Sequence, residues 1–445
     1  MKTVRKLLSI ACIALIFACS TEEPENNIIA ITPGPPEEEP TPPAQPLLVT
    51  YLTVIVDNDY NTNTIPSEDW ILVHRENGDL YNYVPLQNGN TVVLEALDTV
   101  NLANMTVTKL RVNDFGNKLS YNLQSFGKIQ PGRTWTLSGF AASTPLTDLG
   151  QVDITVNNVT AWNSYSLTNT QDYSPPSELS QYAAFNPGFD PNIIDINGFT
   201  YKQTTDYLMT VIDGNWVPTY SLINGLTDGA TITLDGSTQF SAFDQVIAVP
   251  VNSTLNNFSY GVSALNAFTN SRFQLYWTST PNPNYVAGTS SSFSVGYLNA
   301  YQDYETNISM GNPNFSYNYS KKGSPIANGD VVFPTATVTL NDTMFTTYDF
   351  TSTASPITNA SRWGGGMPTD SYKIDWIVYG PTDEIPSIGE MPLVDFPDLD
   401  FANISFISTR LFTQGDGYDI YTGSIFGDGT TTNYNPVQEW FEFKP

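Results

Sequence analysis

The sequence contains few of the residues on which most catalytic and metal sites depend. Its 445 residues include two cysteines and one histidine. Two cysteines are too few for a disulfide framework or a zinc site built on thiolates, and one histidine excludes any mechanism that needs two imidazole groups. The chain also lacks a Gly-x-Ser-x-Gly motif, a His-Glu-x-x-His motif and a phosphate-binding glycine loop. These absences remove the common sequence signatures of hydrolases, metalloproteases and nucleotide-binding enzymes.

Basic residues are scarce as well. The chain has 17 Lys and Arg against 44 Asp and Glu, which gives a net charge of -27. Such a charge repels nucleic acids and anionic membrane surfaces, so we expect no nucleic-acid partner. Charged residues make up 14% of the chain, and its polarity comes instead from Asn, Thr, Ser and Tyr, as on half-exposed β surfaces. A chain disordered throughout is therefore excluded.

Long hydrophobic runs are absent, and the one apolar stretch near the start is too short to span a membrane. Basic residues precede the run Leu7 to Phe17, and small residues follow it, which is the order of a secretory signal. Ile16-Phe17-Ala18-Cys19 resembles the lipobox of bacterial lipoproteins. The resemblance implies that residues 1–18 are removed and that Cys19 is lipidated. The alternative is an ordinary cleaved signal in which Cys19 has no role.

The residues after Cys19 indicate where the protein is displayed. Ser20-Thr21-Glu22-Glu23 is similar to the acidic signal of Bacteroidota lipoproteins exported to the outer face of the outer membrane, although a plain solvated linker has the same composition. Residues 19–46 are rich in Pro and Glu and are predicted to form a disordered, semi-rigid tether. At about 3.1 Å per residue, the extended tether would reach roughly 80 Å. We expect an outer-membrane anchor that faces the extracellular side.

Beyond Leu47 the pattern predicts an all-β fold of tandem immunoglobulin-like, antiparallel β-sandwiches. Short alternating strands are expected at residues 51–56, 69–73, 105–110, 207–211 and 374–379, separated by turns such as Asn88-Gly89 and Asp228-Gly229. Asp69-Trp70 recurs as Asp206-Tyr207 and Asp375-Trp376, which predicts three copies of one sandwich at residues 47–145, 148–280 and 334–445. Residues 281–333 stay unassigned as an extension or a bridge. Chance similarity between Asn/Thr-rich strands is the alternative.

The copies differ in the length of one connection, so binding residues are expected there. The predicted insertions cover residues 158–200 of the second copy and 343–372 of the third. The predicted ligand-binding or partner-binding residues are their aromatic side chains Trp162, Tyr165, Tyr173, Tyr182, Tyr348 and Trp363. Aromatic rings in loops can present flat faces to sugars. The alternative is that these rings cover the edge of a sandwich.

One connection resembles a calcium loop. Asp57, Asp59, Asn61, Asn63 and Glu68 place oxygen ligands at positions 1, 3, 5, 7 and 12 of such a loop. Thr62, however, stands where the loop needs a glycine, and no helices flank the segment. We favour a solvated turn, with calcium as the alternative and otherwise no cofactor.

The repeated aromatic residues, the single histidine and two threonines are interpreted without a binding site. The repeated aromatics Trp70, Tyr207 and Trp376 are predicted to pack between the two sheets, and His74 is predicted to lie on the surface. Asp98-Thr99-Val100 and Asp342-Thr343-Met344 are similar to the O-glycosylation acceptor of Bacteroidota, which makes Thr99 and Thr343 candidates for modification. Unmodified turn or strand threonines fit these tripeptides equally.

Two functional classes remain. We expect a non-enzymatic surface lipoprotein that serves as an interaction or structural subunit of an outer-membrane β-barrel complex for nutrient uptake or protein export. The alternative is a glycan-binding lipoprotein that resembles, in layout, those of polysaccharide-utilisation systems. A glycosidase would need only two carboxylates at a suitable separation, but the sequence selects no such pair.

Overall fold

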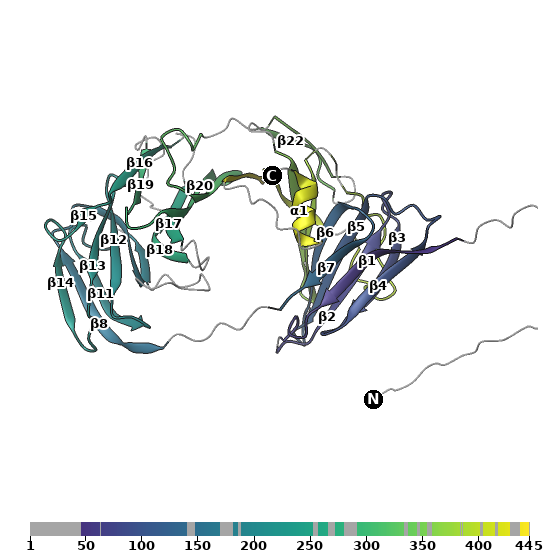
Figure 1. Ribbon diagram of the computed structural model, residues 1–445, viewed down its shortest axis with the longest axis horizontal. Coiled ribbons are helices and arrows are strands. Elements are labelled where there is room, and N and C mark those ends of the chain that lie inside the picture. Colours follow the sequence, from purple (N-terminus) through teal and green to yellow (C-terminus); the bar gives the residue numbers. More distant parts are fainter. Residues whose placement is uncertain are drawn as a thin grey trace, which may run out of the picture. The chain divides into compact units, whose positions relative to one another are not determined.

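The computed structural model describes residues 46–62, 64–139, 147–169, 181–185, 188–251, 257–265, 272–279, 292–332, 337–344, 348–353, 358–382, 384, 386–400, 404–413, 417–427 and 437–444. A compact unit comprises Leu47–Pro445. Its described elements are β-strands and one short helix, which confirms the predicted all-β class (Figure 1). All five expected strands are present.

The first module has seven strands in two sheets. These are β1 (Leu48–Val56), β2 (Ser67–His74), β3 (Leu80–Leu86), β4 (Thr91–Leu97), β5 (Met105–Asp114), β6 (Leu119–Ile129) and β7 (Arg133–Leu137). The smaller sheet has the order β4-β1-β7, in which β1 pairs antiparallel with β4 and parallel with β7. The larger sheet has the order β6-β5-β2-β3. Apolar residues of both sheets form one core between them, which is the expected sandwich.

The second module repeats this topology. Its strands are β8 (Asp148–Asn157), β9 (Trp162–Asn169), β10 (Gln181–Ala184), β11 (Ile194–Lys202), β12 (Tyr207–Asp213), β13 (Pro218–Ile223) and β14 (Thr231–Asp235). β8 pairs antiparallel with β11 and parallel with β14, as β1 does with β4 and β7. The other sheet has the order β10-β9-β12-β13, extended by β15 (Ser241–Ala242). Strand for strand, β9 corresponds to β2, and β12 corresponds to β5.

This correspondence corrects the repeat that the sequence predicted. Residues 158–200 are not an insertion, because they contain β9, β10 and most of β11, three strands of the sandwich itself. The Asp-aromatic motif falls on β2, at the start of β12 and on β25, which are not equivalent strands. Alternation of apolar residues is shared by most half-buried strands, so a short motif of this kind does not identify equivalent positions.

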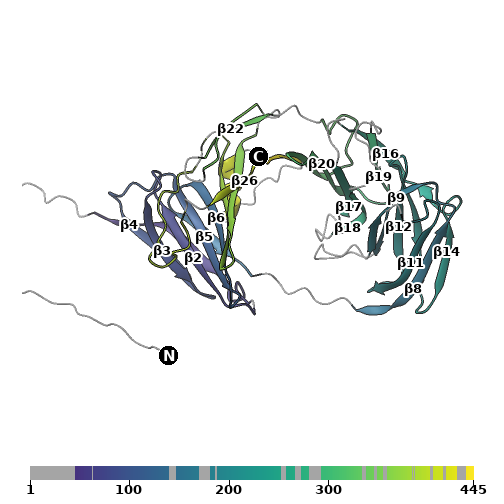
Figure 2. The same cartoon turned by 180° about the vertical axis from the view of Figure 1, so that it is seen from behind.

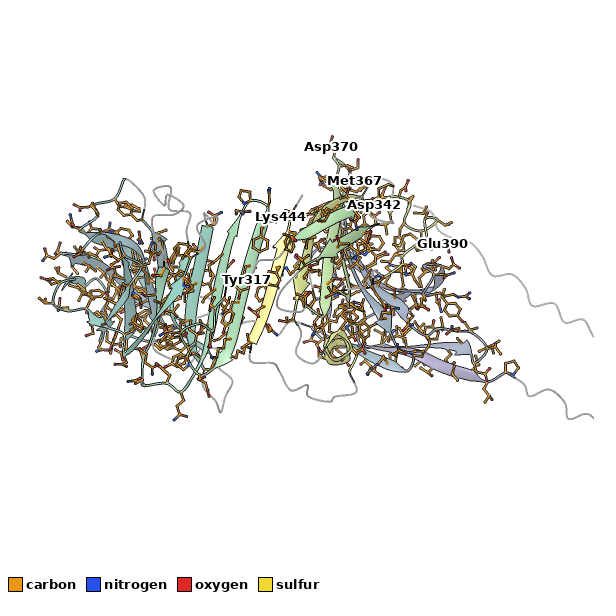
Figure 3. All side chains as sticks on the ribbon, turned by 90° about the horizontal axis from the view of Figure 1, so that it is seen from above. Tyr317, Asp342, Met367, Asp370, Glu390 and Lys444 are labelled. Atoms are coloured by element: carbon orange, nitrogen blue, oxygen red, sulfur yellow. The ribbon has the colours of Figure 1, made fainter. Side chains whose placement is uncertain are left out.

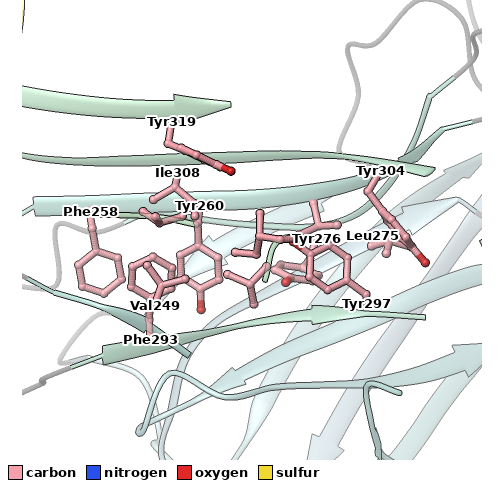
Figure 4. Packing of buried hydrophobic residues seen from close by; sticks show 14 of the residues in the cluster. Val249, Phe258, Tyr260, Leu275, Tyr276, Phe293, Tyr297, Tyr304, Ile308 and Tyr319 are labelled. Atoms are coloured by element: carbon pink, nitrogen blue, oxygen red, sulfur yellow. The ribbon is translucent and has the colours of Figure 1, made fainter. Parts of the chain in front are cut away.

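The third module includes most of the segment left unassigned. It comprises β16 (Gln245–Pro250), β17 (Asn257–Leu265), β18 (Arg272–Ser279), β19 (Ser292–Tyr297), β20 (Asp303–Asn312) and β21 (Phe315–Gly323). β16 pairs with β19, and the larger sheet has the order β18-β17-β20-β21, again the pattern of the first module. Its core is rich in aromatic rings, including Phe258, Tyr260 and Phe293 (Figure 4). Most of residues 281–333 therefore belong to a further sandwich, which corrects the predicted boundary at 280.

The fourth module departs from the pattern. Its strands are β22 (Val338–Asp342), β23 (Asp349–Ser352), β24 (Ala360–Pro368), β25 (Tyr372–Pro381), β26 (Ser405–Phe412) and β27 (Val437–Phe443), and helix α1 (Tyr418–Ile425) precedes β27. The larger sheet has the order β27-β26-β24-β25, while β22 and β23 pair with no other strand among those described. Figure 2 shows β22 and β26 of this module from behind. The predicted insertion 343–372 likewise contains β23 and β24, so it is part of the sandwich.

The larger sheets of three modules join edge to edge into one sheet of 12 strands. β25 pairs parallel with β6 from Tyr372 opposite Leu119 to Tyr379 opposite Phe126. β27 pairs antiparallel with β21 from Phe315 opposite Phe443 to Lys321 opposite Val437. Figure 3 marks this second junction, where Tyr317 lies on β21 beside β27. Each junction covers a sheet edge that would otherwise expose unpaired backbone groups.

The connection between β25 and β26 covers the outer face of the first module. Residues 386–400 pack there, and Trp70 lies edge-on against Phe396 with ring centroids 5.3 Å apart. A Cβ atom at Gly127 or Gly380 would meet the ring of Pro386, so only glycine allows this approach. Trp70 therefore packs on the outer face rather than between the sheets of its own module, which corrects its predicted position. Tyr207 and Trp376 are buried in cores as predicted.

His74 is buried at the end of β2, not on the surface as the sequence predicted. Its Nε2 lies 2.7 Å from the backbone oxygen of Glu390, which belongs to the covering connection. Burial lowers the pKa of His74 below its usual value, although the backbone oxygen and the charge of Glu390 act in the opposite direction. The imidazole is therefore held neutral because a segment over 300 residues later in the sequence covers it.

Candidate functional site

Two arginines of the fourth module stand side by side on the sheet. Arg362 of β24 lies directly opposite Arg410 of β26 in the strand register, so the two side chains project from the same face. Like charges directly opposite each other destabilise a sheet. A pair of arginines is unusual in a chain with only 17 basic residues and a net charge of -27. The fold thus brings two of the few cationic side chains of the protein together, next to the acidic residues Glu439 and Glu442.

The two arginines line a cleft of about 190 Å³, called here the arginine cleft. Helix α1 contributes Tyr421, and the sheet contributes aromatic and polar residues. The complete lining is Arg362, Tyr379, Arg410, Phe412, Thr413, Tyr421, Gln438, Glu439 and Trp440. Aromatic faces, hydrogen-bonding groups and guanidinium groups therefore meet in one small concave site, which is the composition of a ligand-binding cleft.

The two guanidinium groups have different environments. Arg410 Nη2 lies 3.3 Å from Glu442 Oε2, and its guanidinium carbon lies 5.9 Å from the centre of the Trp440 ring. Arg410 Nε is buried and has no hydrogen-bond partner within the described part of the chain. Arg362 has no carboxylate within ion-pair distance among those same residues. The pair thus keeps hydrogen-bonding capacity that the described residues do not use.

Tyr421 lies within electrostatic reach of Arg362. Burial raises the pKa of Tyr421, with the nearby Tyr379 acting in the same direction and the positive charge of Arg362 opposing both. The raised pKa keeps the Tyr421 phenol protonated at neutral pH, and its ring lies 5.8 Å from that of Tyr379. The arginine cleft therefore presents a neutral phenol beside the arginine pair.

A second cleft, of about 270 Å³, opens at one end of the first module. Its charged lining residues are Lys109 and Arg111, and Arg111 Nε and Nη2 donate to the buried Asp69, which does not itself line the cleft, at 2.8 Å and 3.0 Å. Tyr60 at 3.3 Å and Asn61 at 3.0 Å also donate to Asp69. This carboxylate is fully satisfied by its own neighbours, as expected for a buried ion pair that stabilises the end of the sandwich. The arginine cleft is therefore the better candidate for a ligand.

The structure gives no support to the calcium loop. Asn61 Nδ2 donates to Ser67 and Asp69, while Asp59 and Glu68 are exposed. Asn63 lies outside the described residues. Within the described ranges no group of three His, Cys, Asp or Glu residues is placed to hold a metal ion. Calcium stays a prediction that nothing in these contacts favours.

Most of the aromatic residues predicted to bind a ligand or a partner are buried in the cores of the sandwiches. Trp162 and Tyr165 are buried in the second module, and Tyr348 and Trp363 are buried in the fourth, where their rings stack 4.9 Å apart. Tyr182 donates to the backbone oxygen of Ser279 at 2.7 Å and so links β10 to β18. Tyr173 lies outside the described residues. The four buried rings are not available as a binding surface, because Trp162, Tyr165 and Trp363 lie in strands of the sandwiches and Tyr348 directly precedes β23.

Thr99 and Thr343 stay predicted sites of O-glycosylation. Thr99 and Thr343 are both exposed, next to β4 and β22 respectively, so a modifying enzyme could reach them. Cys19 lies outside the described residues. Sequence reasoning missed Arg362 and Arg410, although the scarcity of arginine in the chain was a usable signal. Arg362 and Arg410 are 410 - 362 = 48 residues apart, and nothing local in the sequence shows that their strands place the two side chains opposite each other.

Comparisons with known proteins add little. No family model matches the chain, and no curated protein matches it. A crystal structure described as a tetra-tandem repeat in the extending region of a large adhesion protein is 12% identical, covering 83% of this chain and 95% of that one, with a TM-score of 0.12. A score this low carries no argument, so the fold rests on the strand pairing above. None of the described helices is long and apolar enough to cross a membrane.

Proposed function

We propose that this protein is a non-catalytic, lipid-anchored surface protein that acts as an interaction or structural subunit of an outer-membrane β-barrel complex. The lipobox-like sequence at Cys19 and the acidic residues after it support the anchor and the surface location. The tandem sandwiches, three of which share one continuous sheet, are suited to a stiff framework. To act as a subunit, this framework needs an exposed surface that a partner protein can bind.

The observation that carries this proposal is an apolar surface at the start of the first module, called here the tether-proximal patch. It consists of Leu47, Leu48, Val49 and Leu97, which are 69%, 65%, 45% and 43% exposed. Leu48 lies opposite Leu97 in the register of β1 and β4, so the side chains are neighbours. β4 is also an edge strand of its sheet. Contiguous exposed apolar residues mark interaction sites, unlike apolar residues scattered singly.

The position of the patch in the sequence indicates the kind of partner. It begins directly after the predicted tether, 28 residues from the predicted lipid on Cys19. A partner embedded in the same membrane is within reach of this end of the folded chain. We therefore assign the patch to a β-barrel protein of the outer membrane, whose extracellular loops would cover the apolar residues.

Co-purification from outer membranes in mild detergent tests the proposal. The wild-type lipoprotein is expected to bring down a β-barrel protein in stoichiometric amount, and the double variant Leu48→Ser with Leu97→Ser is expected to lose it. The matched control is Leu393→Ser with Val394→Ser, which removes two exposed apolar residues from the connection before β26. Retention of the barrel by the patch variant, or recovery of the wild type alone, would contradict this function.

The arginine cleft favours a second function, glycan binding. Its Tyr379, Tyr421 and Trp440 rings lie beside Thr413 and Gln438. Rings that offer flat apolar faces next to hydrogen-bonding side chains are suited to sugars. Saturable binding of an oligosaccharide to the purified lipoprotein would support this function, and the absence of binding across a broad glycan array would argue against it.

A further inference from the structure

We propose that the arginine cleft is a binding site for a sugar that carries a carboxylate, namely a terminal uronic acid. The inference deepens the glycan-binding function and rests on it. Three features carry it: the arginine pair, the aromatic walls of the cleft and the net charge of the whole chain.

The arginine pair selects a planar anion. A guanidinium group presents its donors in a rigid fork that matches the two oxygens of a carboxylate. Arg362 has no carboxylate partner among the described residues, and the buried Nε of Arg410 has no hydrogen-bond partner there either. Arg362 is thus prepared to donate hydrogen bonds to an anion from outside the described chain, and Arg410 keeps an unused Nε donor beside its contact with Glu442. A ligand carboxylate would also relieve the repulsion between two arginines on facing strands.

The walls of the cleft select a sugar rather than an acidic peptide. Tyr379 and Trp440 of the sheet and Tyr421 of helix α1 line the cleft, and Trp440 is already placed near Arg410. Thr413 and Gln438 add polar groups to the lining. A sugar ring has both an apolar face for stacking and hydroxyl groups around its edge, so it can use both kinds of wall. The cleft volume of about 190 Å³ suits a single terminal residue better than a long chain segment.

The charge of the whole chain limits the ligand further. With a net charge of -27, the protein repels polyanions at long range. Screening at physiological salt confines most of this repulsion to about 8 Å. A saccharide with one carboxylate at its end would meet the arginine pair without bringing further negative charge to the surface. We therefore expect a single terminal uronate to bind better than a polyuronate.

Isothermal titration of the full-length lipoprotein in detergent tests this assignment. The probes are disaccharides that end in glucuronate or galacturonate. Each is compared with the corresponding neutral disaccharide, the neutral twin, in which a hydroxymethyl group replaces the carboxylate. At least one acidic disaccharide is expected to bind about tenfold or more tightly than its neutral twin, because charge-assisted bidentate hydrogen bonds are among the strongest. Polygalacturonate is expected to bind more weakly than the acidic disaccharide.

Matched variants locate the binding. Arg362→Gln is expected to abolish the preference for the acidic sugar, whereas Arg362→Lys should keep part of it, because charge remains but the fork is lost. The control Arg75→Gln removes an exposed arginine from the first module and is expected to change nothing. Trp440→Ala should weaken the acidic and neutral sugars alike. Thermal unfolding of each variant shows whether it is folded.

The outcomes separate this inference from the functions proposed above. Equal binding of acidic and neutral sugars, or a preference that survives Arg362→Gln in a folded variant, would overturn the uronate assignment and leave glycan binding standing. Stronger competition by a short glutamate-rich peptide than by any sugar would overturn it in favour of an acidic peptide. Binding of no sugar at all would remove both this inference and the glycan function, while the β-barrel subunit would be unaffected.

Discussion

A single histidine makes the protein's pH dependence unusually simple to interpret. His74 is the only histidine in the sequence, and it is buried and neutral beneath the connection of residues 386–400. The unfolded chain would bind a proton at an ordinary histidine pKa near 6.5, whereas burial holds the folded pKa lower. Below about pH 6.5 the unfolded state therefore binds more protons than the folded state, so the free energy of unfolding falls as pH falls.

We predict that stability declines by up to about 1.4 kcal/mol per pH unit from this residue as pH falls below 6.5, until the lowered folded pKa is reached. Urea denaturation of wild type and His74→Gln at pH 7.5 and 5.5 measures the effect. The variant is expected to be less stable at pH 7.5 but to lose less stability on acidification. Equal losses in the two proteins would show that the imidazole does not carry the dependence.

At the same scale, the aromatic residues show how burial decides a role. Trp162 and Trp363 have the residue type expected of a sugar-binding surface, yet both lie in sandwich cores. Two of the rings that line the arginine cleft, Tyr421 and Trp440, belong to the segment after residue 413, where the sequence showed no insertion. The chemistry of a side chain is fixed by its type, but its availability depends on what packs against it.

At the scale of elements, the short strand β27 pairs with strands of two different modules. This last strand pairs with β26 at four positions and with β21 at seven. Tyr317 of β21 donates a hydrogen bond of 2.6 Å to Glu439 of β27, which adds a side-chain link to the backbone ladder. β27 therefore joins the larger sheet of the third module to that of the fourth.

Truncation after residue 436 is expected to expose the backbone of β21. Without its partner, amides in residues 315–321 should exchange hydrogen much faster, because their ladder hydrogen bonds are lost. Hydrogen exchange read by mass spectrometry measures this, with deletion of Pro445 alone as the control and the β5 residues of the first module as an internal reference. Unchanged protection in β21 would mean that β27 does not hold this edge.

At the scale of the whole molecule, the anchor is predicted to depend on one thiol. Cys19→Ser should leave the protein unlipidated and no longer bound to membranes, whereas Cys12→Ser should change little, because Cys12 lies within the segment predicted to be removed. Fractionation of cells with detection of the lipid by mass spectrometry distinguishes the two variants. Membrane retention of Cys19→Ser without a lipid would contradict the anchor and point to a different attachment.

The sequence determined the features that depend on local order and composition. Alternating apolar residues predicted strands such as β1, β2 and β5, and the turn at Asn88-Gly89 is present with Gly89 at a φ of 75°. The start of the compact unit at Leu47 follows a Pro-rich and Glu-rich stretch. These features need no knowledge of distant partners, since strand period, turn geometry and the inability of such stretches to build a core are local properties.

Tertiary structure decided which strands are equivalent, how many sandwiches they form and which side chains remain accessible. The pairing of β8 with β14, of β25 with β6 and of Arg362 with Arg410 joins residues far apart in the chain. Alternation tells which residues share a face of a strand, but not which neighbour covers that face or lies at that edge. The burial of His74 and the assembly of the arginine cleft depend on those neighbours, so only the folded chain reveals them.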